Sequence, residues 1–382
     1  MQVNQVAEIV NALSEQYLGE SAVTTTDLTN VVDVGRAVFD INHFDKYVNS
    51  LIDHIGKVVF VNRAYRGKTP SLVMDAWEYG AVLEKITYDE YPEAQVNDSW
   101  NLQDGQSYDP NVFYKPKVSA KFFQSKNTFD IPMSFAERQV KSAFSSASQL
   151  MAFFGMIETV IQNSMTIKMD QLSEAALNNM IALTISDNNA NRAVNLLSRY
   201  NSAFSPSPSL TAAKAITDPD FLRFAAYTMK LYSERIQRMS KLFNVGGKER
   251  FTPSDRLHMV LLSEFAAGAE AYLYSNTFHD QFVHLAKAES VPYWQGSGTD
   301  YAFGSTSKIM VTPAGVPNAS PVTASGILGV MFDRDAVGVA NLDRRTTSNW
   351  NGRAEFYNNW YKFDAGYFND PNENFVVFYV AD

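Results

Sequence analysis

The residues that could bind a metal ion or transfer protons are few and widely spaced in this sequence. It contains no cysteine, and the closest two of its five histidines, His279 and His284, stand five positions apart. Residues five apart on a helix point to different sides, so this spacing does not favour a shared metal ion. We therefore predict no metal site and no other cofactor. The histidines are His43, His54, His258, His279 and His284.

Asp333 and Asp335, on either side of Arg334, are a pair whose chemistry would suit general acid–base catalysis. A spacing of two at the end of a strand is more typical of a turn with a surface ion pair. The glycines between 296 and 304 are more typical of a turn than of a phosphate-binding loop, because no Gly-Lys-Ser/Thr follows them. The chain also lacks His-Glu-x-x-His and Gly-x-Ser-x-Gly motifs, so we predict no catalytic residues and no enzyme activity.

The composition indicates a folded protein with large buried surfaces and no membrane segment. Of 382 residues, 46% are hydrophobic and 13% aromatic, and rings must be buried in a core or at an interface. The net charge of -9 argues against a protein that reads DNA bases with a basic face, although not against one that encloses DNA. The first residues show no secretory signal, and no apolar run approaches the roughly 18 residues of a membrane span. We therefore expect synthesis in a cytoplasm and no membrane partner.

The strongest helical pattern lies between Phe144 and Leu183, where apolar residues recur at steps of three or four and only Gly155 interrupts. About 40 residues at 1.5 Å each would span roughly 60 Å. The pattern predicts one long helix, or two if it is broken, that would position the other elements. Its Met-rich and Phe-rich stripe is typical of a buried core face.

The segment before this helix predicts a long two-stranded excursion. Residues 62–110 are polar and rich in turn formers, and residues 112–123 then alternate as in a returning strand. Pro116 and the nearby lysines are typical of an edge strand, because Pro cannot donate a ladder hydrogen bond and Lys discourages further pairing. A hairpin this long is not stable by itself in water, so we expect another subunit to cover it.

The remaining elements alternate between helices and strands without an internal repeat, which indicates an α+β fold. Asp218 and Pro219 are typical of the N-cap and first turn of a helix whose apolar pattern runs to Met239 and whose predicted end is at Gly246 and Gly247. Ser205 to Ser209 is a predicted loop. The other predicted helices are residues 1–18, 39–55 and 264–274, and the predicted strands are residues 58–61, 257–262, 327–332 and 375–379.

Eight large aromatic residues crowd a stretch of 19 residues near the C-terminal end. This density suits strand faces and a contact between subunits. The alternative, that the rings only fill the core of one subunit, stays open at this point. The residues are Trp350, Phe356, Tyr357, Trp360, Tyr361, Phe363, Tyr367 and Phe368.

Taken in order, several segments resemble the major capsid proteins of tailed bacteriophages with the Hong Kong 97-type fold, particularly those of picovirus-like short-tailed phages. The resemblance runs along nearly the whole chain, and its order and spacing are more specific than any single motif. The segments are residues 34–39, 49–59, 144–183, 257–264, 329–335, 353–363 and 374–378.

This resemblance implies a division of the chain into the parts of that fold. An N-terminal arm with an entry helix precedes an extended hairpin, the E-loop; a peripheral domain carries the long spine helix, and an axial domain is built on a central mixed sheet. The implied parts are the arm and entry helix at 1–56, the E-loop at 57–131, the peripheral domain with the spine helix at 132–185, the axial domain at 186–335, the return strands of the peripheral domain at 336–372, and a C-terminal axial strand at 373–382.

The resemblance also implies a function. Subunits would self-assemble into pentamers and hexamers through E-loop, N-arm and peripheral-domain contacts, forming an icosahedral or prolate virion shell around double-stranded DNA. Assembly would take place in the host cytoplasm. Because only about 55 residues precede the E-loop, a separate scaffolding protein is expected, together with a portal. DNA would be contacted without base reading, through phosphates.

Two further questions concern chemistry and class. Some relatives crosslink a loop lysine to an asparagine of a neighbour, but nothing around Lys68, Lys115, Lys117 or Lys121 marks an activated amine. We therefore predict no crosslink. The alternative class is another virion structural protein, such as a tail-tube or adhesin subunit, and a compact hydrolase comes third because compact enzymes rarely leave so long an arm uncovered.

Overall fold

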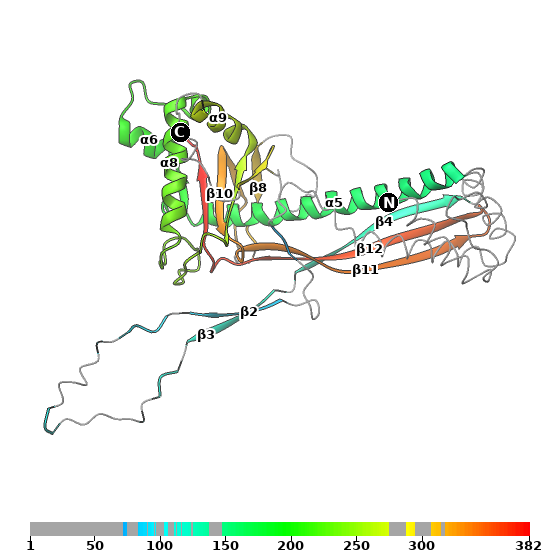
Figure 1. Cartoon of the computed structure of the whole chain (residues 1–382), viewed down its shortest axis with the longest axis horizontal. Helices are drawn as coiled ribbons and strands as arrows, with labels where there is room; N and C mark the ends of the chain where they lie inside the picture. The colour runs from blue at the N-terminus through cyan, green and yellow to red at the C-terminus, as the bar shows by residue number, and fades with distance from the viewer. Residues whose placement is uncertain are drawn as a thin grey trace. The chain divides into compact units, whose positions relative to one another are not determined.

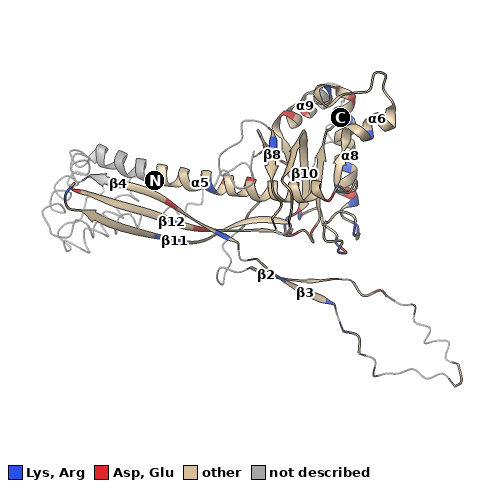
Figure 2. Cartoon of the chain, turned by 180° about the vertical axis from the view of Figure 1, so that it is seen from behind, with Lys and Arg blue, Asp and Glu red and all other residues tan. Residues whose placement is uncertain are grey.

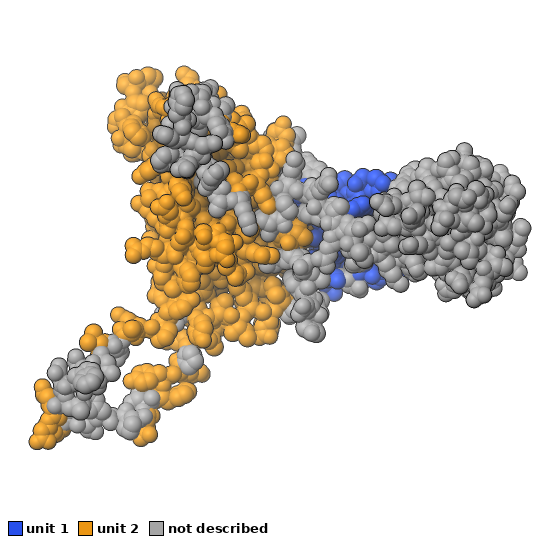
Figure 3. Space-filling model, viewed as in Figure 1, with its two compact units in different colours: residues 1–70, 126–170, 340–366 blue, residues 71–125, 171–339, 367–382 orange. Residues whose placement is uncertain are grey.

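The structure is a computed structural model, and it describes residues 72–74, 83–89, 91–94, 96, 103–105, 111, 113–115, 117–123, 125–136, 147–274, 288–294, 307–314 and 318–382. The chain divides into two compact units (Figure 3). Unit 1 draws its described residues from 126–170 and 340–366, and unit 2 from 71–125, 171–339 and 367–382. The helices predicted at 1–18 and 39–55, the strand predicted at 58–61 and the glycines at 296–298 lie outside the described residues.

Unit 2 is built on a five-stranded mixed sheet with the order β5-β13-β10-β6-β7. The central strand β10 is antiparallel to both of its neighbours, while the two edge strands run parallel to theirs. All residues of β6 and β10 are buried, which explains why these strands are continuous apolar runs instead of alternating ones. The strands predicted at 257–262, 327–332 and 375–379 are confirmed. The bounds are β5 Ala193–Asn195, β6 Leu257–Leu262, β7 Ala288–Val291, β10 Ile327–Asp333 and β13 Phe375–Tyr379.

Of the helices in the described residues, four lie entirely in unit 2, and Figure 1 shows α6, α8 and α9 beside strands of this sheet. They are α6 Leu196–Phe204, α7 Ala212–Ala215, α8 Pro219–Arg235 and α9 Ser263–Tyr274. The predicted start of α8 is confirmed, because the Asp218 carboxylate accepts a hydrogen bond of 2.8 Å from the Phe221 N–H and Pro219 occupies the first turn. Ser205 is the C-cap of α6, as expected of the predicted loop.

The predicted continuation of α8 through Met239 to an end at Gly246 and Gly247 is wrong. The helix ends at Arg235, and the carbonyl of Ile236 accepts a hydrogen bond from Thr252, a residue outside the helix. Ser240 and Arg250 then form an antiparallel bridge. The apolar side chain of Ile236 is buried whereas that of Met239 is exposed, so the helical periodicity ended one turn earlier than the apolar residues suggested.

The long helix is confirmed as a single element, α5, which spans Ala147–Ser186 and has 40 residues. At 1.5 Å per residue its length is about 60 Å. In the part that belongs to unit 1, buried side chains recur at Ile161, Met165 and Met169, which is the predicted core stripe. From Met169 to Thr184 nearly every side chain is buried, as expected of a helix covered on all sides.

Unit 1 contains a sheet in which β11, β12 and β4 are neighbours in that order, and α5 lies alongside these strands in Figures 1 and 2. β4 spans Lys126–Ala136, β11 spans Val337–Asn351 and β12 spans Phe356–Asn369. β12 and β4 are antiparallel, with Trp360 opposite Pro132. The aromatic stretch divides by strand alternation: Tyr357 and Tyr361 are buried, while Phe356 and Trp360 on the other face are only half-buried.

Three shorter strands or strand pairs complete the described structure. β1 spans Val73–Met74, β2 Leu83–Tyr88 pairs with β3 Val118–Phe123, and β8 Lys308–Val311 pairs with β9 Val322–Ser325. Gly326, between β9 and β10, has a φ of 70°. A side chain at this position would also meet the Val380 carbonyl at 2.3 Å, so glycine is required there. β2, β8 and β9 were not predicted from the sequence.

Candidate assembly site

The hairpin formed by β2 and β3 belongs to unit 2 and has two chemically different faces. The strands are antiparallel with Lys85 opposite Lys121 and Tyr88 opposite Val118. Because side chains alternate along each strand, Lys85 and Lys121 share one face with their second neighbours, and Tyr88 and Val118 share the other. The predicted returning strand at 118–123 is confirmed, and its partner is the unpredicted β2.

One face of the hairpin is exposed and mostly apolar, with Glu84, opposite Phe122, as its charged member in the paired strands. Ile86, Tyr88, Val118 and Phe122 are exposed by 67, 54, 53 and 57%, respectively, and Ala120 lies among them. Exposed apolar side chains continue beyond the paired strands, and contiguous groups of this kind mark surfaces that another molecule covers. These further residues are Tyr91, Val96, Phe113 and Tyr114.

The other face is polar and contacts the remainder of unit 2. The Lys85 ammonium lies 2.9 Å from Asp370 Oδ2 and 2.7 Å from Glu373 Oε1. The Lys121 ammonium lies 3.2 Å from Asp370 Oδ1. Arg250 completes the group, with its Nε 3.3 Å from Glu373 Oε1. We call these five residues the ion cluster; the basic and acidic positions of the chain are coloured in Figure 2.

Further polar contacts continue along this face of the hairpin. Arg250 Nη1 donates to the Tyr88 carbonyl at 2.9 Å. Asp89, directly after β2, accepts hydrogen bonds from Ser119 at 2.8 Å and from Lys248 at 2.7 Å. The hydrogen bonds from Lys248 and Ser119 hold the pKa of the exposed Asp89 carboxyl below its ordinary value. The hairpin is therefore attached to its own subunit mainly through charged and polar groups.

The two acids of the ion cluster differ in electrostatic state. Burial alone would raise the pKa of Asp370, but the charges of Lys85 and Lys121 and the hydrogen bond from the Asn372 N–H together outweigh it and lower that pKa. Burial is also the largest influence on Glu373, where it exceeds the attraction of Lys85 and Arg250 and raises the pKa. The fold therefore favours the charged form of Asp370 and disfavours the charged form of Glu373.

The loop lysines considered for a crosslink lie in different surroundings. Lys121 is engaged with Asp370 in the ion cluster. Lys115 is exposed, the carbonyl of Lys117 accepts from the Asp89 N–H, and Lys68 lies outside the described residues. The ion cluster was not identified from the sequence, because Lys85 and Asp370 are 285 positions apart.

The predicted turn at Asp333 and Asp335 is confirmed. Asp333 accepts a hydrogen bond of 2.9 Å from the Asp335 N–H, and Asp335 forms an ion pair with Arg256 at the surface. His258 lies in β6 with its ring 6.1 Å from that of Phe332. The other four histidines lie outside the described residues.

The described residues show neither a clustered metal site nor a membrane-spanning helix. No group of three or more His, Asp or Glu side chains there has the arrangement of a metal site. No helix in that same part of the chain combines the length and the apolar character that a membrane span requires.

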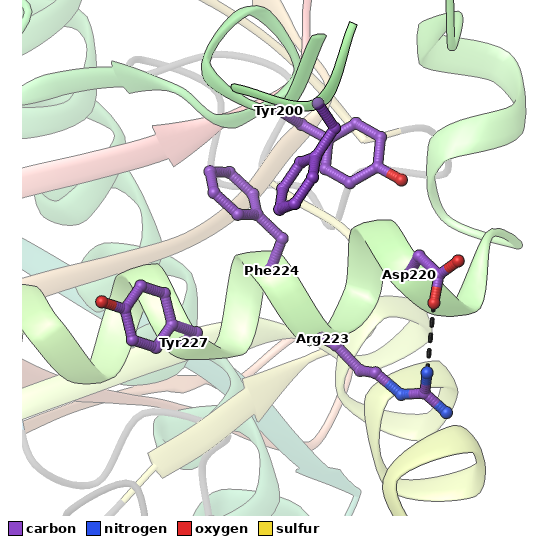
Figure 4. A pocket seen from close by; sticks show the side chains of 6 residues that line it. Tyr200, Asp220, Arg223, Phe224 and Tyr227 are labelled. Atoms are coloured by element: carbon purple, nitrogen blue, oxygen red, sulfur yellow. Dashed lines mark hydrogen bonds and ion pairs between the residues drawn. The ribbon is translucent and has the colours of Figure 1, made fainter. Parts of the chain in front are cut away.

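A second exposed apolar feature of unit 2 is a cleft of 490 Å³ between α6 and α8 (Figure 4). Its wall is aromatic, with the Tyr200 and Phe224 rings 5.6 Å apart and Phe204 5.7 Å from Phe224. Arg223 and Asp220 form an ion pair of 3.1 Å in its lining. Burial, followed by the charges of Asp218 and Asp220, raises the pKa of Tyr200. Unlike the hairpin, this cleft has its apolar rings packed against one another.

The arrangement of helices and sheets is similar to that of phage structures. A chain in the capsid structure of Staphylococcus phage Andhra is 9% identical, with a TM-score of 0.52 over 81% of this chain and 83% of that chain. A chain in the structure of the head fiber and inner core protein gp22 of native bacteriophage P68 is also 9% identical, with a TM-score of 0.52 over 82% of this chain and 85% of that chain. No curated protein sequence matches the chain.

The long helix, the mixed sheet and the hairpin place the chain in the fold class of these phage structures. At the level of its helices and sheets, the predicted Hong Kong 97-type fold is confirmed. The chain belongs to the family of Phi29-like phage major capsid proteins, whose profile matches residues 6–379. It is therefore a major capsid protein, a structural part of the virion that assembles with copies of itself into the shell. The tail-tube or adhesin alternative is not favoured.

Proposed function

We propose that the apolar face of the β2–β3 hairpin is the surface through which one subunit binds the next. The observation that supports this proposal is the reversal of the usual strand arrangement. A strand pair normally turns its apolar face to its own core, but this one turns Lys85 and Lys121 to its own subunit and leaves Ile86 and Phe122 exposed.

The size of this face is sufficient for a weak, repeated contact. Complete burial of a large apolar side chain contributes about 1.5–3 kcal/mol, and Ile86, Tyr88, Val118 and Phe122 are each somewhat more than half exposed. Covering all four would therefore contribute roughly 4–7 kcal/mol per hairpin. Each subunit of a closed shell makes the contact once as donor and once as acceptor, so many modest contacts stabilise the whole.

The division of the chain into capsid parts is also a proposal. The hairpin lies within the E-loop at 57–131, α5 forms the spine of the peripheral domain, and the five-stranded sheet forms the axial domain. The described hairpin and its exposed side chains support the first assignment. β4 begins at Lys126 and continues to Ala136, so one strand spans the proposed E-loop boundary.

The remaining proposals rest on family membership. The subunits would form pentamers and hexamers of an icosahedral or prolate shell, with N-arm and peripheral-domain contacts in addition to the E-loop. A separate scaffolding protein, a portal and non-specific phosphate contacts to packaged double-stranded DNA are expected. Assembly would take place in the host cytoplasm, and the role would be structural, without catalysis.

The proposal is tested by Phe122→Lys, which places a charge on the apolar face without touching the ion cluster. Met310→Lys is the matched control, because Met310 is similarly exposed, at 58%, in strand β8 of the same unit. The full chain, co-expressed with its scaffolding protein, is viewed by electron microscopy. We expect shells from the wild type and from Met310→Lys, and unassembled subunits with unchanged circular dichroism from Phe122→Lys. Normal shells from Phe122→Lys, in normal yield, would refute the proposal.

A further inference from the structure

The ion cluster joins two strands of the hairpin to two distant segments of the same unit. Lys85 from β2 and Lys121 from β3 both reach Asp370, and Lys85 also reaches Glu373 and the carbonyl of Asp335. The two acids lie in the tight connection between β12 and β13, where the Asp370 N–H donates to the Ala336 carbonyl at 2.8 Å. Charged contacts thus connect the hairpin to the end of the five-stranded sheet at which β13 begins.

Apolar contact holds the hairpin only at one end. The Phe123 ring lies 5.3 Å from that of Phe368, and Phe123 is buried. From this point outward, the attachments are Lys85 and Lys121 to the acids and then Arg250 to the Tyr88 carbonyl. The hairpin could therefore turn about the Phe123–Phe368 contact. The ion cluster lies farther along the strands from this contact.

Ionic attachments have an energetic property that apolar packing lacks. Removing charges from water costs nearly as much as their mutual attraction returns, so a buried ion group contributes little net stability but requires a definite geometry. Here the Asp370 side chain is 2% exposed while that of Lys121 is 38% exposed, so water can reach one edge of the cluster. The ion cluster therefore specifies the orientation of the hairpin, while its charged groups can still exchange their partners for water.

We infer that the ion cluster is a latch that fixes the direction in which the hairpin presents its apolar face. It is thus a regulator of the assembly surface, and its effect on shells rests on the proposed function. With the latch closed, the angle between the hairpin and the sheet is set by the three ion pairs that Lys85 and Lys121 form with Asp370 and Glu373. With the latch open, the hairpin turns about Phe123 and presents the same apolar face over a range of angles.

The latch itself is tested without assembly, by hydrogen–deuterium exchange on the full-length protein. The variant Lys85→Met/Asp370→Asn/Glu373→Gln removes three of the five charges, including both acids, and keeps similar side-chain volumes. Its control is Asp220→Asn/Arg223→Met, which removes an exposed ion pair of α8. We expect the amides of 83–89 and 118–123 to exchange at least about tenfold faster in the triple variant and unchanged in the control. Unchanged exchange of both segments would overturn the latch.

A second variant tests the latch if the triple variant misfolds. In Lys121→Glu the new carboxylate repels Asp370 and opens the latch. Because Lys121 is the most exposed member of the cluster, the five-stranded sheet should stay folded. The amides of β6 and β10 report on this directly. With those amides unchanged, faster exchange in 83–89 supports the latch, and wild-type exchange there refutes it.

The link to assembly is measured separately, as the distribution of shell diameters. We expect the Lys121→Glu subunit to form shells of broader size range than the wild type. Uniform wild-type diameters together with faster hairpin exchange would overturn the regulatory role. Failure of the proposed function is distinguishable, since it appears as normal assembly by Phe122→Lys and leaves the exchange result unaffected.

Discussion

Replacing Asp370 by Asn should destabilise the subunit far more than replacing Glu373 by Gln, although both remove one negative charge from the ion cluster. Asp370 uses both oxygens: Oδ2 accepts from Lys85 at 2.9 Å, and Oδ1 accepts from Lys121 at 3.2 Å and from the Asn372 N–H at 3.1 Å. An Asn amide that keeps the Oδ1 contacts turns its NH₂ group toward the Lys85 ammonium. Two donors then face each other around a side chain that is 2% exposed.

The magnitude follows from these contacts. Removing one partner from a buried ion group costs about 3–5 kcal/mol, because the remaining charge loses its compensation. We expect this loss in the free energy of unfolding for Asp370→Asn. Glu373 accepts from Lys85 and Arg250 through the same atom, Oε1, which Gln retains. Its pKa is raised by burial, so its charge is disfavoured and Glu373→Gln should change stability by about 1 kcal/mol or less.

The two acids also predict opposite pH effects. The pKa of Asp370 is lowered in the fold, so its stabilising contribution is present above its ordinary value of 3.8 and is lost as the pH falls through the lower folded value. The pKa of Glu373 is raised, so stability from its protonated form is complete below 4.5 and is lost as the pH rises through the folded value. The free energy of unfolding of Glu373→Gln, relative to wild type, should therefore be higher at neutral pH than at pH 4.5. The loss of unfolding free energy caused by Asp370→Asn should be largest at neutral pH.

The assay is urea unfolding of each variant, followed by circular dichroism at a series of pH values. The wild type and the two single variants are compared at equal protein concentration, because assembly also stabilises the fold. Equal losses for the two variants would refute the assignment of different roles to the acids. A loss of less than about 1 kcal/mol for Asp370→Asn at neutral pH would refute the buried, doubly paired state of this carboxylate.

Two further predictions concern helices. Asp218→Ala removes the cap of α8 and should lower the free energy of unfolding by about 1 kcal/mol, while Asp220→Ala, two residues later in the first turn and exposed, should cost less. Equal losses in chemical denaturation would contradict the cap. Ile161→Asp buries an unpaired charge in α5 and should abolish shells in electron micrographs. Val160→Asp, at a half-exposed position, should leave the shells intact. Normal shells from Ile161→Asp would show that this face of the helix is not part of the core.

Elements whose signals are local in the sequence were predicted well. α5 has a repeat of three and four over 40 residues, and no other structure buries such a stripe. The start of α8 depends on one carboxylate and the N–H three residues later. The strands β6, β10 and β13 are short apolar runs bounded by polar residues, which is typical of strands covered on both faces.

Strands in turn-rich regions, which depend on a paired strand, were missed. β2 has apolar and charged residues in alternation but lies in a polar, turn-rich region, and it becomes a strand because β3 pairs with it. Among the described strands, β8 and β9 likewise pair only with each other. The end of α8 was placed too late because the signal that stops it, the hydrogen bond from Thr252 to the Ile236 carbonyl, is made by a residue outside the helix.

By itself, the sequence determined that a strand at 118–123 has a lysine face with Ser119, Lys121 and Phe123 and an apolar face with Val118, Ala120 and Phe122, because side chains alternate along any strand. Only the tertiary structure decided which face points outward. That choice depends on Asp370 and Glu373, which the fold brings to Lys85 and Lys121 from the other end of the chain. Charges need partners when they leave water, so the lysine face turned inward and the apolar face was left for a neighbouring subunit.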